Sequence, residues 1–97
     1  MIRHIVVWRV KDGPDRQRTL DAIRERLLGL KSVITEIRKL DVGVNITPGP
    51  DASDVLLYSE FDSTGDLAAY QRHPEHVRFV EFMAPLKLEK RVLDHEF

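Results

Sequence analysis

Three side chains suited to proton transfer near neutral pH lie within residues 70–76 of the chain. This stretch is Tyr-Gln-Arg-His-Pro-Glu-His, so Tyr70, His73 and His76 fall within two helical turns around one proline. An imidazole can take up a proton near neutral pH, and a phenol can donate a hydrogen bond to an oxygen that gains negative charge. These residues are therefore the first candidates for general acid–base chemistry.

A fourth candidate, His4, lies in an apolar segment at residues 2–10, where a polar ring needs a partner. We favour Asp94, in the last predicted strand, as that partner. An aspartate behind an imidazole would fix the tautomer of the ring. The residues alone leave open whether Asp94 orients His4 or His76.

The composition predicts one compact, soluble domain spanning residues 1–97. Fifteen basic and sixteen acidic residues are spread along the chain and give a net charge of -1, which argues against nucleic-acid binding and a polybasic membrane anchor. The absence of cysteine excludes disulfides and thiolate chemistry and agrees with a cytoplasmic location. Arg9, Lys11 and Asp12 interrupt the first apolar run too early for a signal peptide or a membrane span.

Hydrophobic periodicity predicts four strands and helical segments between them. A Ser-Thr-Gly-Asp sequence at 63–66 resembles a helix cap, and Pro74 suits the first turn of a further helix. The expected strands are residues 2–10, 37–46, 55–61 and 88–96, and the expected helices are 14–31, 64–70 and 74–83. This β-α-β-β-α-β order is α+β and ferredoxin-like.

The first strand carries apolar side chains on both faces, with Val6 and Trp8 on one and Ile5 and Val7 on the other. Helices on one face of the sheet would leave the second apolar face open to solvent. We therefore predict a symmetric homodimer in which two sheets face each other to form a barrel.

Three segments together resemble the stress-responsive A/B barrel family, the Dabb domain. They are the opening Met1-Ile-Arg-His-Ile-Val-Val-Trp-Arg-Val-Lys-Asp12, the block Tyr70-Gln-Arg-His-Pro-Glu-His76 and the closing Val92-Leu-Asp-His-Glu-Phe97. The resemblance covers essentially the whole chain. It implies a dimeric α/β barrel of ferredoxin-like protomers, in agreement with the periodicity.

The resemblance also implies an activity. Plant polyketide cyclases of this family catalyse an intramolecular aldol condensation without metal or organic cofactor, using a tyrosine and a histidine as acid and base. The matching residues here are Tyr70 and His76, with His4 and Asp94 as the matching polar neighbours. A cofactor-free cyclase or lyase acting on a small carbonyl compound is the activity that follows.

An apolar wall beside these groups would suit a small hydrophobic or aromatic ligand. Trp8 is large enough to fill such a pocket instead of lining it. The residues expected in the wall are Val6, Trp8, Leu57, Phe61, Val77 and Val92.

Other interpretations stay open at this stage. The polar residues could simply stabilise a non-catalytic stress-response or small-ligand-binding protein, and a cofactor-independent monooxygenase is a further alternative. His73 and His76 have a spacing that could suit a metal, but without a third ligand no metal site is predicted. His95 alternates away from Asp94 and is expected on the dimer face or in solvent.

Overall fold

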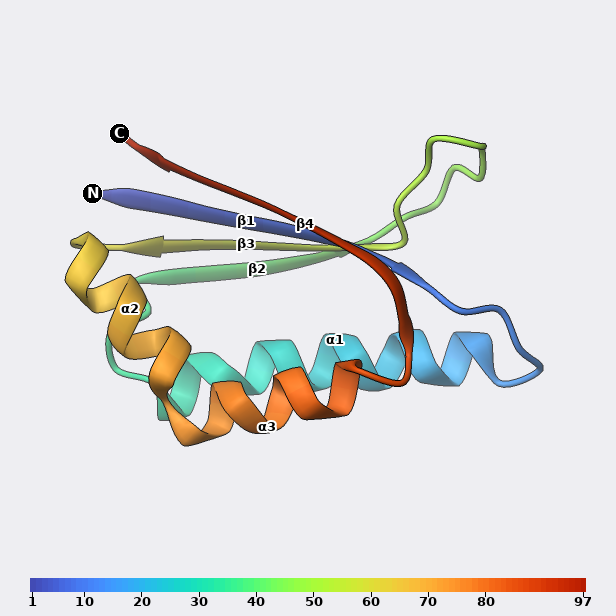
Figure 1. The fold of residues 1–97 in the computed structure, drawn as a ribbon, viewed down its shortest axis with the longest axis horizontal. Helices are drawn as coiled ribbons and strands as arrows, with labels where there is room; N and C mark the ends of the chain where they lie inside the picture. Colours follow the sequence, from blue (N-terminus) through green and yellow to red (C-terminus); the bar gives the residue numbers. More distant parts are fainter.

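The computed structural model describes residues 1–97, and its centre is one antiparallel sheet of four strands (Figure 1). The strands are β1 (Ile2–Val10), β2 (Lys39–Val44), β3 (Val55–Phe61) and β4 (Lys87–Glu96). They lie in the order β2-β3-β1-β4, with β1 between β3 and β4. The ferredoxin-like order predicted from the sequence is confirmed.

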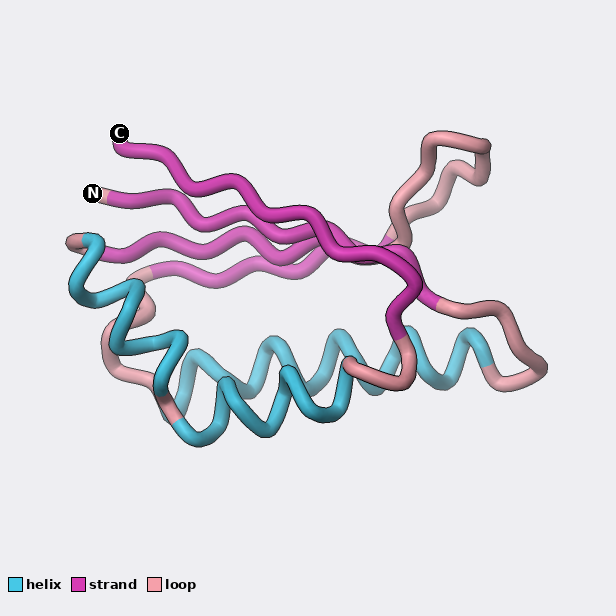
Figure 2. Tube along the Cα trace, in the orientation of Figure 1, coloured by secondary structure: helices cyan, strands magenta, loops and turns pink.

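Three helices cover one face of this sheet, and the opposite face is bare (Figure 2). They are α1 (Arg16–Val33), α2 (Thr64–Arg72) and α3 (Pro74–Met83). In Figure 1, α1 and α3 run side by side beneath the strands, and α2 leads down from the end of β3. None of the helices is both long and apolar enough to cross a membrane.

The break between α2 and α3 is set by His73 and Pro74. Pro74 has no backbone N–H to donate to the preceding turn, so a continuous helix would lose a hydrogen bond there. His73 instead adopts an extended backbone and its Nδ1 accepts a 3.0 Å hydrogen bond from the Glu75 N–H. This cap starts α3 in a new direction, as the sequence predicts.

Several elements begin or end within two residues of their expected bounds, and some of these differences have a local cause. The first helix begins at Arg16 and continues to Val33, where Ile34 becomes extended. The second strand ends at Val44, because the Asn45 side chain donates to and accepts from the backbone of Thr47 and so closes a turn.

The alternation of β1 divides its side chains between the core and the bare face. His4, Val6 and Trp8 point toward the helices and are each at most 4% exposed. Ile5 and Val7 lie on the other face and are only partly covered. The core is therefore a single layer between sheet and helices, and the polar His4 is inside it.

Candidate functional site

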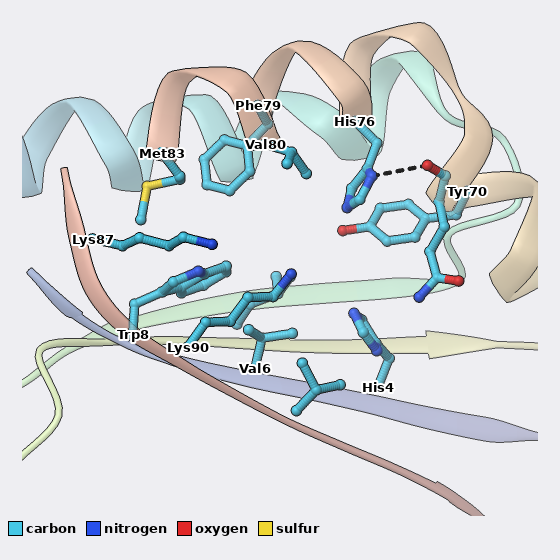
Figure 3. A pocket seen from close by; sticks show the side chains of 13 residues that line it. His4, Val6, Trp8, Tyr70, His76, Phe79, Val80, Met83, Lys87 and Lys90 are labelled. Carbon is cyan, nitrogen blue, oxygen red and sulfur yellow. Dashed lines mark hydrogen bonds between the residues drawn. The ribbon is translucent and has the colours of Figure 1, made fainter. Parts of the chain in front are cut away.

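A cavity of about 60 Å³ lies between the inner face of the sheet and α2–α3 (Figure 3). A single water needs about 10 to 15 Å³ on the same measure, so the space suits a small molecule. The thirteen residues that line it are His4, Val6, Trp8, Leu57, Tyr70, Gln71, His76, Phe79, Val80, Met83, Lys87, Lys90 and Val92.

His4 reaches the cavity from β1 and is oriented by Asp94. The two residues are directly paired across β1 and β4, and His4 Nδ1 lies 2.5 Å from Asp94 Oδ1. Since a carboxylate accepts, Nδ1 is the donor. The opposite edge of the ring, which carries Nε2, faces Tyr70 and the cavity. The structure therefore answers the question left by the sequence: Asp94 contacts His4 and not His76.

His76 projects from the first turn of α3 and is held by a backbone carbonyl. Its Nδ1 lies 3.1 Å from the carbonyl oxygen of Gln71, which can only accept, so this nitrogen carries the proton. Nε2 of the neutral ring is then left with a free lone pair. Burial lowers the pKa of His76 below its ordinary value of 6.5. The hydrogen bond to Gln71 acts in the opposite direction, and the nearby charge of Lys90 lowers the pKa further. The ring is consequently neutral at neutral pH.

Tyr70 lies between the two imidazoles. Its ring centroid is 4.4 Å from that of His76 and 5.9 Å from that of His4. The side chain is 1% exposed, and its hydroxyl points along the cavity without a hydrogen bond to another protein group. Burial raises the pKa of Tyr70 well above its ordinary value of 10.0. The phenol is therefore protonated at neutral pH and free to donate to a ligand.

These three groups have complementary chemistry. His76 has a free basic nitrogen, Tyr70 has a free donor, and His4 is fixed in one tautomer by a carboxylate. A base and a donor on the same side of an apolar cavity can remove a proton from carbon and stabilise the oxyanion that forms.

Comparison with known proteins places the chain in a family. The family model described as "Stress responsive A/B Barrel Domain" matches residues 2–97. The chain belongs to the stress-responsive A/B barrel domain family. The resemblance expected from the three sequence segments is thereby confirmed.

Two curated relatives support this membership. An uncharacterised protein of Streptomyces coelicolor is 33% identical over 78 residues, which cover 78% of this chain and 79% of that protein. A stress-response A/B barrel domain-containing protein of Arabidopsis thaliana is 30% identical over 88 residues, or 84% of this chain. The match spans only 30% of the length of the Arabidopsis protein.

Solved structures share the fold along nearly the whole chain. A dimeric ferredoxin-like protein from Bacteroides fragilis has a TM-score of 0.90 and 34% identity, with 99% of this chain and 95% of that chain covered. A hydroxynitrile lyase from Passiflora edulis has a TM-score of 0.85 and 23% identity, with 97% of this chain and 90% of that chain covered. At that identity, the likeness to the lyase concerns the fold alone.

The structure places most of the predicted wall residues of this Dabb domain around the cavity. Val6, Leu57 and Val92 line it, as do the polar residues His4, Tyr70 and His76. Trp8 also lines it and packs edge-on to Phe79, with ring centroids 5.8 Å apart. Trp8 thus forms one end of the cavity and does not fill it.

Two predicted wall residues lie elsewhere. Phe61 is fully buried behind the site, with its ring centroid 5.0 Å from that of Tyr70, so it supports that ring and does not reach the cavity. Val77 is 42% exposed. Each helical residue is rotated by roughly 100° from the last, which turns Val77 away from the face that His76, Phe79 and Met83 present to the sheet.

The sequence interpretation missed two lysines, Lys87 and Lys90, in the cavity wall. For Lys90 a signal was present, because Asp94, Val92 and Lys90 alternate along one strand and must share a face. For Lys87 there was none. The pairing of β1 with β4 shifts register between Arg9 and Val10, so that Lys87 is paired with Val10. This shift turns the Lys87 side chain toward the helices.

The two remaining histidines stay outside the cavity. His73 caps α3, and His95 is paired with Arg3 on the bare face of the sheet, as predicted. Four more cavity residues that the sequence interpretation did not place there come from α2 and α3: Gln71, Phe79, Val80 and Met83. No three His, Cys, Asp or Glu side chains are grouped as metal ligands would be.

Proposed function

We propose that this Dabb domain is a cofactor-free lyase or cyclase that acts on a small carbonyl compound, with His76 as general base and Tyr70 as hydrogen-bond donor. One observation carries the proposal. The Nδ1 of His76 is committed to the Gln71 carbonyl, so its basic Nε2 is left on the cavity side, next to a Tyr70 hydroxyl that has no protein partner.

The chemistry follows from these two groups. Nε2 of His76 takes a proton from the carbon beside a carbonyl. The C–H electron pair then forms the carbon–carbon double bond of an enolate, and the π pair of the carbonyl moves onto its oxygen. Tyr70 donates a hydrogen bond to that oxygen as it gains charge. The enolate then attacks a second carbonyl within the same molecule, and the imidazolium returns its proton to the new alkoxide. Cleavage of a carbon–carbon bond follows the same steps in reverse.

His4 and Asp94 act as positioning residues in this scheme. The 2.5 Å contact with Asp94 holds the His4 ring edge-on to Tyr70, at an interplanar angle of 66°. A fixed His4 ring restricts the tilt of the phenol, and a catalytic donor must be held close to its productive geometry. The Passiflora lyase indicates only that one protein with this fold is a lyase.

Turnover of small β-hydroxy carbonyl and β-dicarbonyl compounds tests the proposal. We expect Tyr70→Phe and His76→Gln to lower kcat/KM by about 10² to 10⁴, the usual contribution of a general acid or base. His95→Gln is the matched control, because its ring lies on the other face of the sheet, and it should keep full activity. Product analysis by chromatography and mass spectrometry, with circular dichroism to verify folding, measures the effect.

Two results would count against this mechanism. Unchanged turnover in folded Tyr70→Phe and His76→Gln would remove both residues from it. Saturable binding of such compounds without any turnover would support the alternative, a small-ligand-binding protein.

We also propose that the chain forms a homodimer through the bare face of its sheet. Leu56 and Leu93 on this face are 38% and 56% exposed, and Ile5 and Val7 lie between them on β1. Such an apolar face is characteristic of interaction surfaces. The Bacteroides fragilis protein, at 34% identity, is described as dimeric.

A further inference from the structure

The cavity wall carries positive charge without a matching negative charge. Lys87 and Lys90 both line it, and none of the thirteen lining residues is an aspartate or a glutamate. Neither lysine belongs to any of the ion pairs of the chain. The nearest acidic residue on the inner face of β4, Asp94, is already bound to His4.

The backbone of β4 directs both lysines into the cavity. Lys90 is paired with Trp8 and Lys87 with Val10, and both partners point toward the helices. Figure 3 shows the two ammonium groups extending from β4 into the space below α3, with Trp8 at one end and Tyr70 at the other. The charges therefore border the same cavity as the candidate base and donor.

Lys87 is half-buried and Lys90 is more exposed, so solvent screens part of their charge, but no carboxylate in the cavity wall supplies a counter-charge. Burial, and then the charge of Lys87, lower the pKa of Lys90 below its ordinary value of 10.5. An arriving anion would relieve this destabilisation, whereas a neutral ligand would leave it in place.

We propose that the substrate of this cavity is a small keto carboxylate, with its carboxylate held by Lys90 and Lys87 and its carbonyl directed toward Tyr70 and His76. This proposal rests on the proposed function and specifies its substrate class. The apolar part of the molecule packs against Val6, Leu57 and Phe79.

A carboxylate fits the wall better than a phosphate does. The cavity is small, eight of its thirteen lining residues are hydrophobic, and no arginine is among them. A phosphate would need donors for several oxygens, while a carboxylate on an apolar body needs few beyond two ammonium groups.

Binding of a carboxylate also affects the base. The charge of Lys90 contributes to the low pKa of His76. When a bound carboxylate neutralises that charge, the pKa of His76 should rise, and its Nε2 becomes a stronger base at the time the substrate is present.

The test compares two ligands of the same shape that differ in charge. We would titrate the protein with 4-oxopentanoate and with 4-oxopentanamide, following affinity by isothermal calorimetry and contacts by ¹H–¹⁵N NMR at low ionic strength. The wild type should bind the carboxylate about tenfold more tightly than the amide, as expected for one partly desolvated ion pair. Lys90→Met should abolish this preference, while Lys31→Met, on the exposed side of α1, should preserve it.

Equal affinity for the two ligands in the wild type would overturn the proposal, as would a preference that Lys90→Met leaves unchanged. So would a failure of the carboxylate to bind at millimolar concentration. Because binding is measured without turnover, the two proposals fail separately. A carboxylate preference in a protein that turns over nothing would refute only the enzyme, and turnover of neutral carbonyls without the preference would refute only the substrate class.

Discussion

At the scale of single residues, the site depends on which ring nitrogen of each histidine is already bonded. His4 and His76 both use Nδ1 for a fixed protein partner, a carboxylate in one case and a backbone carbonyl in the other. Both rings therefore present Nε2 toward Tyr70. The residue types, and Asp94 as the favoured partner of His4, could be predicted from the sequence. The choice of His4 over His76 as the partner of Asp94 depends on the register of β4, and the Gln71 carbonyl as the partner of His76 depends on the bend at His73, so neither could be predicted.

The lowered pKa of His76 predicts a specific pH dependence of stability. The unfolded chain takes up a proton near pH 6.5, whereas the folded chain does so at lower pH. Between these two values the unfolded state binds more protons, so the free energy of unfolding should fall as the pH drops below about 6.5. Urea unfolding of the wild type and His76→Gln at several pH values measures this, and the variant should lose part of the slope. An identical slope in both proteins would contradict the assignment.

At the scale of elements, the sequence could predict what repeats regularly. The four strands, the capped α2 and the Pro74 start of α3 all follow from local patterns, and the structure places them within a few residues of their expected bounds. Departures from regular alternation could not be foreseen. Because of the register shift in β4, regular alternation does not predict that Lys87 faces the cavity. Val77 was expected in the cavity wall, but it lies on the exposed side of α3.

The cap of α2 should contribute to the stability of the element that carries Tyr70. Ser63 Oγ accepts a 3.1 Å hydrogen bond from the Asp66 N–H and satisfies one free donor at the start of this helix. Ser63→Ala should therefore lower the free energy of unfolding by about 1 kcal/mol. Thr35→Ala, at an exposed position outside the helices, serves as the control in chemical denaturation. Equal stability of the Ser63 variant and the wild type would show that the cap contributes nothing.

At the scale of the whole molecule, side chains that alternate along each strand give the sheet two different faces. The inner face and the helices enclose the cavity, and the outer face remains free for a second copy. The chain can thus bury its outer apolar residues in a dimer without obstructing the site.

A charge placed on the outer face should separate the proposed dimer. Leu56 on β3 and Leu28 on α1 are each 38% exposed, which makes them a matched pair on different surfaces. Leu56→Lys should shift the protein toward monomer, because it would bury an unpaired charge in the interface, and Leu28→Lys should not. Native mass spectrometry and sedimentation at micromolar concentration report the state. A monomeric wild type would refute the homodimer.

The most direct test of the central claim is proton exchange on carbon, because it needs only the first chemical step. Small ketones and keto carboxylates would be incubated with the protein in D₂O, and deuterium at the carbon beside the carbonyl would be followed by NMR. If His76 is the base and Tyr70 the donor, the wild type and His95→Gln will catalyse exchange, while His76→Gln and Tyr70→Phe will not. Exchange that persists in folded His76→Gln, or no exchange above the buffer rate in the wild type with any of these compounds, would contradict the account.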